Sequence, residues 1–267
     1  MITRERAQTL FSGRFLYAVF CKILFGWYDG RESKGGGMIE ENSLDKWLDN
    51  TATGGYLKTA EQAFFAAHTA NPYGITVVAS LCGWDGWPQQ VLQLGRGRAQ
   101  ADVVCALPQL PLLSDSVQTL LLPHGLELCA RPEDLLRECF RVLVPNGSLV
   151  LSGFNPYSLW RFGLPEKQLG LRAHALPLPK VRRMLAEAGF RPDMGRFMVY
   201  VPPWENERAL RRWHFMELAG NRWWPAAAAA YGLAAVKTVY PLTPLREKVG
   251  KLRGEGFSLL PGNCRQG

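Results

Sequence analysis

The sequence predicts an α/β protein with a doubly wound, mainly parallel sheet, helices on both faces and a helical, aromatic-rich insert towards the C-terminal end. Short apolar runs alternate with stretches of helical periodicity, the order expected when crossover helices join parallel strands. The first apolar run, residues 75–81, is continuous rather than alternating, which is typical of a strand covered on both faces. An apolar content of 47% with 20% charged residues excludes extensive disorder.

The 267 residues divide into three predicted segments. Residues 1–37 are expected to be an N-terminal extension outside the functional protein, because Met38 follows three glycines and offers a second start. Residues 38–240 carry the alternating pattern and form the predicted domain. Residues 241–267 hold charge and glycine with little apolar periodicity, so a flexible basic tail is expected there.

Neither of two long apolar runs is predicted to cross a membrane. Residues 15–28 and 223–236 are each fourteen residues long, and a span needs about 20. The first run is not followed by a small-residue cleavage site, so a signal peptide is not expected either. The six cysteines form no CxxC pair, which favours reduced thiols and a cytoplasmic protein. No metal is expected, because the four histidines are far apart in the sequence.

Two helices are expected before the first strand. The first begins at the cap offered by Asn42 and Ser43, and residues 51–55 are expected to end it. The second covers residues 56–68. Its polar side chains, Glu61 among them, are expected to face solvent, opposite an apolar face that packs on the sheet.

Beyond residues 75–81, the remaining elements follow from short apolar runs separated by turn residues or by helical periodicity. The expected strands are 90–94, 102–106, 117–122, 148–152, 197–201 and 231–239. The expected helices are 132–143, with acidic residues in its first turn, and 179–188, which Gly189 ends.

Residues 106–156 combine five features in a fixed order. A loop ends in Leu110-Pro111, a strand follows the Asp115-Ser116 turn, and that strand ends in Pro123-His124-Gly125-Leu126-Glu127. The helix over 132–143 and the turn Pro145-Asn146-Gly147 come next. In order and spacing, this stretch resembles the middle of the class I S-adenosylmethionine-dependent methyltransferases of the small-molecule type. A looser resemblance covers residues 51–239, and together they imply a Rossmann-like fold with S-adenosylmethionine as cofactor.

The resemblance also implies where the cofactor is held. In the family, a glycine-rich loop after the first strand lets backbone approach the methionine and ribose. A residue at the second strand binds the ribose hydroxyls, a backbone amide after the third strand meets the adenine, and the end of the fourth strand lies beside the cofactor. By this correspondence the expected cofactor-binding residues are Gly83, Asp85, Gly86, Gln93, Leu107 and Pro123.

The cofactor segment departs from the family pattern at several positions. Trp84 and Trp87 place two indoles in the glycine loop. Gln93 stands in place of a carboxylate, so a charge-assisted hydrogen bond to the ribose is lost. The acidic residue that meets the adenine amine is replaced by Ala106.

Three further residues are candidates for the chemistry. His124 lies where the family turns its fourth strand towards cofactor and substrate, so it is the candidate catalytic residue, although a structural histidine is the alternative. Asn155 and Tyr157 follow the fifth expected strand, and loops at the carboxyl ends of parallel strands line the substrate crevice.

The resemblance implies direct displacement of a methyl group from the sulfonium, which needs positioning more than a strong acid or base. We therefore expect methyl transfer to a small-molecule acceptor. The net charge of +8 leaves an anionic acceptor open. An inactive methyltransferase-like binding or regulatory module is the alternative, because of the departures in the cofactor segment. Nucleic acid is not an expected partner, although residues 161–222 hold twelve Lys and Arg against six acids.

Overall fold

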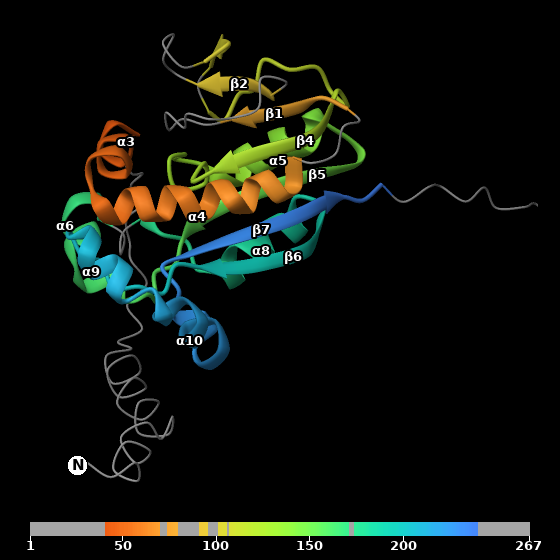
Figure 1. Ribbon diagram of the computed structural model, residues 1–267. Helices are drawn as coiled ribbons and strands as arrows, with labels where there is room; N and C mark the ends of the chain where they lie inside the picture. The colour runs from red at the N-terminus through yellow and green to blue at the C-terminus, as the bar shows by residue number, and fades with distance from the viewer. Residues whose placement is uncertain are drawn as a thin grey trace, which may run out of the picture.

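The computed structural model describes residues 41–69, 74–79, 91–95, 101–105, 107–170 and 174–239. These residues form an α/β fold around a seven-stranded sheet with the order β3-β2-β1-β4-β5-β7-β6 (Figure 1). The strands are β1 (Thr76–Ala79), β2 (Val91–Gly95), β3 (Val103–Val104), β4 (Val117–Pro123), β5 (Leu143–Phe154), β6 (Phe190–Met198) and β7 (Ala230–Lys237). The predicted fold class is confirmed.

The sheet is parallel except at β7. Strands β1 to β5 pair in parallel, whereas β7 is antiparallel to both β5 and β6. Since β7 runs against both neighbours, β6 has the same direction as β5. The strands β1 to β6 therefore all end at one edge of the sheet, which we call the carboxyl edge.

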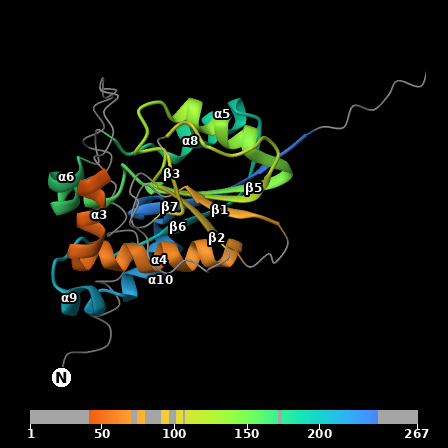
Figure 2. The same ribbon diagram turned by 90° about the horizontal axis from the view of Figure 1, so that it is seen from above.

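Helices cover both faces of the sheet, as Figure 2 shows from above. α4 (Ala52–Thr69) lies on one face, and α5 (Pro132–Val142) and α8 (Leu178–Glu187) lie on the other. The remaining helical segments are α3 (Glu41–Asn50), η1 (Leu159–Phe162), α6 (Leu164–Leu169), α9 (Glu207–Arg212), α10 (Phe215–Trp223) and η2 (Pro225–Ala227). Of these, α3, α6 and α9 gather at the carboxyl edge (Figure 1), where α3 contacts α6 and α4 contacts α9.

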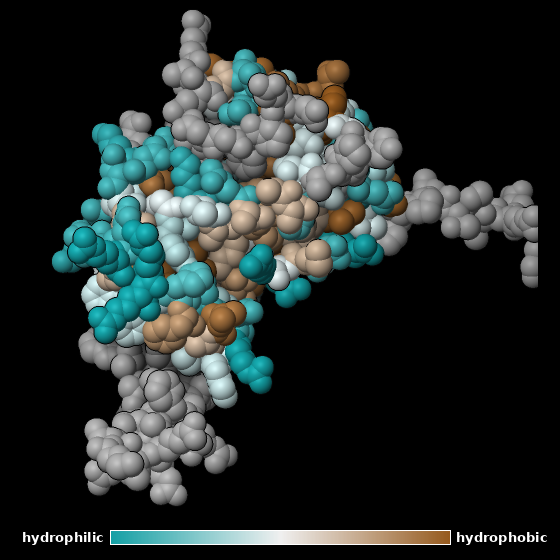
Figure 3. All heavy atoms as spheres, in the orientation of Figure 1, coloured by the Kyte–Doolittle hydropathy of each residue, from teal (hydrophilic) through white to brown (hydrophobic). Residues whose placement is uncertain are grey.

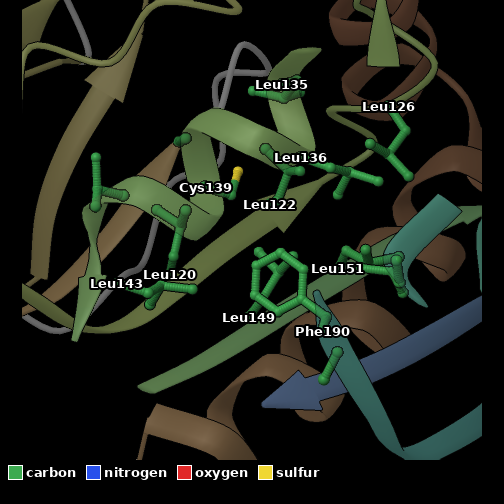
Figure 4. Close-up of a cluster of buried hydrophobic side chains, with 14 of the residues drawn as sticks. Leu120, Leu122, Leu126, Leu135, Leu136, Cys139, Leu143, Leu149, Leu151 and Phe190 are labelled. Carbon is green, nitrogen blue, oxygen red and sulfur yellow. The ribbon is translucent and has the colours of Figure 1, made fainter. Parts of the chain in front are cut away.

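Two hydrophobic cores follow from the alternation of side chains along the strands. Leu121 and Val150 face α4, whereas Leu120, Leu122 and Leu149 face α5 and α8. Figure 4 shows the second core, in which Leu135, Leu136 and Cys139 of α5 pack over β4 and β5. Alternate residues of one strand thus serve different cores, which explains the continuous apolar runs in the sequence.

Several element boundaries differ from those expected. β5 begins at Leu143, because the Pro145-Asn146-Gly147 segment forms an irregularity within the strand rather than a turn before it. Asn146 takes a φ of 63° there. β6 covers Phe190–Met198, earlier than the expected 197–201. Within the described residues, no helix is long and apolar enough to cross a membrane.

The expected break at residues 51–55 is limited to Thr51. Its Oγ1 accepts a hydrogen bond from the backbone N–H of Gly54 at 2.9 Å, and α4 begins immediately at Ala52. Gly54 lies where α3 and α4 approach each other, because a Cβ there would overlap the carbonyl oxygen of Trp47. A Cβ on the neighbouring Gly55 would meet nothing within 4 Å.

These two glycines give a matched test of the α3–α4 corner. We expect Gly54→Ala to lower the free energy of unfolding by about 1–3 kcal/mol, because the added methyl forces the two backbones apart. Gly55→Ala should leave it unchanged or raise it by up to about 1 kcal/mol, since alanine favours the helix. Urea unfolding of both variants measures the difference, and equal stability would contradict the close approach.

Candidate functional site

The strand order places a topological switch at the carboxyl edge. The chain passes from β1 to β2 and β3 on one side, and returns to β4 on the other. At a topological switch, the loops that follow two neighbouring strands run in opposite directions and form a crevice between them. Ligands of open α/β sheets bind in this crevice. The glycine loop expected after β1, with Gly83, Asp85 and Gly86, lies outside the described residues. Its described neighbours at this edge are the ends of β1, β2 and β4.

Small residues end the two strands beside the switch. β1 ends at Ala79 and β2 at Gly95, and both residues are buried. A small side chain at a strand end lets a ligand approach the backbone closely. Beyond β3, the side chain of Leu107 is partly buried and packs against both hydrophobic cores. This part of the edge fits a ligand held by backbone groups and an apolar contact.

Gln93 lies within the sheet rather than at the edge itself. It is partly buried, pairs with Val78 and stands two residues before the end of β2. Its backbone N–H donates to Oδ2 of Asp102 at 2.8 Å. The exposed carboxylate of Asp102, nine residues further along the chain, therefore lies beside the backbone of Gln93.

A buried ionisable cluster marks the carboxyl end of β4. Pro123 is the last residue of β4, and His124 follows with a φ of 49°. Nδ1 of His124 lies 2.8 Å from Oε2 of Glu127. Its Nε2 lies 3.1 and 3.2 Å from the two carboxylate oxygens of Glu61 on α4. All three side chains are essentially inaccessible to solvent.

Two contacts complete this cluster, which we call the Glu61–His124–Glu127 cluster. The backbone N–H of Phe154 donates to Oε1 of Glu127 at 2.6 Å, and the Phe154 ring lies over the imidazole at a centroid distance of 4.4 Å. The cluster therefore joins α4, the end of β4 and the end of β5.

The two carboxylates set the charge of the imidazole. Burial lowers the pKa of His124, but the charges and hydrogen bonds of Glu61 and Glu127 outweigh this effect and raise the pKa to about 10. Burial raises the pKa of Glu127, which the hydrogen bonds from His124 and Phe154 oppose. The raised pKa favours the imidazolium form of His124 at neutral pH. Each ring nitrogen lies against a glutamate side chain, so the ring offers no free nitrogen to a substrate.

The expectation that Glu61 faces solvent is wrong, because its side chain is fully buried. The neighbours of Glu61 in the helical repeat indicate that its side chain is buried. Leu57 stands one helical turn before Glu61, and Phe64 and Phe65 one turn after, and all three are buried. Glu61 therefore lies in the middle of the apolar face of α4, where a carboxylate needs a buried cation.

The two crevice candidates differ in what their side chains do. Asn155 is buried, its amide donates to the carbonyls of Ala226 and Ala228 at 2.8 Å, and its Oδ1 accepts from the backbone N–H of Tyr157. It therefore holds the start of β7 beside the end of β5. Tyr157 is 44% exposed at the same edge.

The helices at the carboxyl edge border an open hollow that the sequence did not indicate. It has a volume of about 480 Å³ and lies between the η1–α6 segment and the loop before α9. Phe162, Lys167, Trp204 and Glu205 are among its lining residues. Two aromatic rings with one charge of each sign suit a small molecule with an apolar body and a polar group. Among the described residues, no three His, Cys, Asp or Glu side chains gather as a metal site.

Sequence comparisons match the central part of the chain. A family model described as a methyltransferase domain matches residues 63–151. The uncharacterized protein YafS of Escherichia coli (strain K12) is 53% identical over 49 residues, which cover 18% of this chain and 20% of YafS. The mitochondrial 2-methoxy-6-polyprenyl-1,4-benzoquinol methylase of Caenorhabditis elegans is 34% identical over 77 residues, or 25% of this chain and 27% of that enzyme. The chain thus matches less than a third of the length of either relative.

Solved structures match over most of the chain. An S-adenosylmethionine-dependent methyltransferase from Thermotoga maritima superposes with a TM-score of 0.52 and 15% identity, covering 74% of this chain and 95% of that one. A chain of the complex between the Haloferax volcanii Trm112 methyltransferase activator and a methyltransferase gives 0.50 and 15%, covering 75% and 98%. At 15% identity the likeness concerns the fold. The shared fold covers almost the whole length of the two solved structures and about three quarters of this chain.

The buried cluster leads to a stability prediction. His124→Gln removes the cation between two buried carboxylates, so we expect the free energy of unfolding to fall by about 3–5 kcal/mol. His68→Gln is the control, because His68 lies on α4, the helix that carries Glu61, is only partly buried and is hydrogen-bonded to the carbonyl of Phe64. Urea unfolding of both variants is the measurement, and similar losses would contradict a dominant role for the cluster.

The raised pKa of His124 also predicts how stability depends on pH. In the unfolded chain the imidazole has a pKa of about 6.5, and in the folded chain of about 10. Between these values the folded state binds more protons, so this contribution is fully present below about 6.5 and is lost as pH rises towards 10. The free energy of unfolding of the wild type should therefore decrease as pH rises across this range, and a free energy of unfolding that stays constant or increases would contradict the prediction.

Proposed function

We propose that this chain, which resembles the class I S-adenosylmethionine-dependent methyltransferases in its central sequence and its fold, binds that cofactor at the carboxyl edge and methylates a small molecule. The observation that carries the proposal is the position of the match. Residues 63–151 run from α4 through β1 to β4 and into β5, and so include the topological switch at which ligands of open α/β sheets bind.

Small residues at the strand ends support this proposal, since Ala79 ends β1 and Gly95 ends β2. The backbone amide of Leu107, which follows β3, is our candidate contact for the adenine. In our proposal, backbone around Gly83, Asp85 and Gly86 meets the methionine and ribose, Gln93 contributes at the second strand, and Pro123 borders the site. When bound, the cofactor supplies an electrophilic methyl group on its sulfonium.

The residues of this chain then act by positioning. The Glu61–His124–Glu127 cluster fixes the ends of β4 and β5 relative to α4, and Asn155 fixes the start of β7. The exposed Tyr157 and the hollow lined by Phe162, Lys167 and Trp204 are our candidates for the acceptor side. A lipophilic acceptor suits the aromatic side chains. Lys167 would pair with an anionic group on the acceptor, whereas Glu205, which also lines the hollow, would oppose one.

A second candidate function is a methyltransferase-like module that binds a ligand without turnover. The observation in its favour is the uncharged side chain of Gln93, while the neighbouring carboxylate of Asp102 is already engaged by the backbone N–H of Gln93. An enzyme and a module differ first in whether the cofactor binds at all.

Calorimetric titration of the full chain with S-adenosylmethionine and S-adenosylhomocysteine tests the proposal. Loss of one charge-assisted hydrogen bond costs roughly 1.5–3 kcal/mol, or about one to two decades in affinity, so we expect a Kd of tens to hundreds of micromolar. Gly83→Val should abolish binding, because the side chain fills the space that the cofactor needs. Gly55→Ala, far from β1 in the sequence and free of neighbours, should bind like the wild type.

Binding without turnover would favour the module. The distinguishing measurement is transfer of an isotopic methyl group from the cofactor to small-molecule extracts. Absence of any heat or thermal shift at millimolar cofactor would overturn the methyltransferase proposal.

A further inference from the structure

Helix α10 exposes three large apolar side chains. Phe215, Leu218 and Trp223 are 56%, 82% and 57% exposed. Its inward side holds Gly220, which is buried, and Met216 and Glu217, which are partly buried, and Met216 packs against the first hydrophobic core. A surface helix normally turns its large apolar side chains towards the core, whereas most of those on α10 face solvent. An exposed apolar face of this kind marks a binding surface.

The orientation of α10 is fixed by its inward side. A Cβ on Gly220 would overlap the ring of Tyr200, so the helix approaches that ring closely. Oε1 of Glu217 accepts hydrogen bonds from the backbone N–H of Tyr200 at 2.9 Å and from the hydroxyl of Tyr56 at 3.3 Å. Rotation of the helix to bury Leu218 would break these bonds, and the apolar face therefore stays exposed.

Two tryptophans and several arginines surround this face. Trp213 precedes the helix and stacks on Phe215 at a ring-centroid distance of 5.7 Å, while Arg222 lies over Trp223 at 5.9 Å. Arg208 and Arg212 project from α9, immediately before it, and are exposed. Figure 3 shows apolar side chains over α10 next to a hydrophilic surface over α9. We call Trp213, Phe215, Leu218, Arg222 and Trp223 the α10 surface.

The composition of the α10 surface favours a lipid bilayer over other occupants. Aromatic rings with arginines around an aliphatic side chain are what interfacial helices present to anionic headgroups and acyl chains. Glu207 pairs with Arg211, so Arg208, Arg212 and Arg222 outnumber the remaining exposed acid, Glu205, and leave the region basic. A second copy of the chain would bring two such basic surfaces together, which like charges oppose. A phosphate backbone would contact the arginines but would leave Leu218, the most exposed of these side chains, without an apolar partner.

We propose that the α10 surface binds the face of an anionic membrane. Phe215 and Leu218 enter the boundary between headgroups and acyl chains, Trp213 and Trp223 lie at headgroup level, and the arginines contact lipid phosphates. This binding is independent of the methyltransferase proposal, because it needs neither cofactor nor acceptor.

Vesicle co-sedimentation of the full chain tests the proposal. The vesicles contain phosphatidylcholine with about one third phosphatidylglycerol, or phosphatidylcholine only. We expect binding to the anionic vesicles, weakened by salt, and a loss of about tenfold or more in Leu218→Glu. Leu113→Glu is the matched control, because Leu113 is 80% exposed in the loop before β4. It should bind like the wild type.

Folding is checked by thermal unfolding, which should be the same in all three proteins because both leucines are exposed. A wild type that does not bind anionic vesicles, or equal binding by wild type and Leu218→Glu, would overturn the proposal. Two further results would also overturn it: a dimer in size-exclusion chromatography that Leu218→Glu dissociates, or binding of a single-stranded RNA oligomer in place of vesicles.

Discussion

The buried imidazolium of His124 holds together the part of the molecule on which the candidate site depends. Two carboxylates and a histidine with no solvent contact would each cost several kcal/mol to bury, and only their mutual contacts offset that cost. Because Glu61 comes from α4, Glu127 from the turn after β4, and the Phe154 N–H from β5, these contacts form only when all three elements are in place. The carboxyl edge is thus specified by electrostatics as well as by packing. If only apolar side chains met here, α4 could shift along the sheet by one residue without leaving a buried charge unpaired. With the Glu61–His124–Glu127 cluster in place, the same shift would leave buried charges unpaired.

The same principle recurs in the C-terminal insert. Glu217 on α10 also faces inwards, and its partners are a backbone N–H beyond β6 and a tyrosine hydroxyl from α4. Burial, together with the charge of Glu217, raises the pKa of Tyr56 well above its usual value, so the hydroxyl keeps the proton that it donates. Glu61 lies within the apolar face of α4 and adds a buried contact to the orientation that packing already gives that helix. In α10, the contacts of Glu217 and of the partly buried Met216 hold the helix so that Phe215 and Leu218 stay exposed.

The sequence predicts the framework of the fold well and the site only in part. The strands β1, β2, β4 and β5 and the helices α5 and α8 were predicted because their apolar periodicity is local. The antiparallel direction of β7 was not, since it depends on pairing with β5 and β6 and not on the residues of β7. Glu61 was assigned to solvent because its partner lies 63 residues away in the sequence. The amide of Asn155 likewise donates to two carbonyls more than 70 positions away, which the sequence did not indicate, and its place in the crevice stays a prediction. Gly83, Asp85 and Gly86 lie outside the described residues, and their role remains a prediction.

These long-range polar contacts explain why a fold can be shared at 15% identity while its site is not readable from a motif. A hydrophobic core accepts many sequences with the same pattern, so the sheet order survives extensive substitution. A buried carboxylate needs a hydrogen-bond donor or a cation beside it, and which residue supplies this partner depends on the three-dimensional structure rather than on the neighbouring sequence. In this chain the polar residues that appear isolated in the sequence, Glu61, His124, Asn155 and Glu217, are those that contact distant segments at the carboxyl edge or in the insert beside it. The polar side chains that break a local pattern therefore mark where the chain is held together around its candidate site.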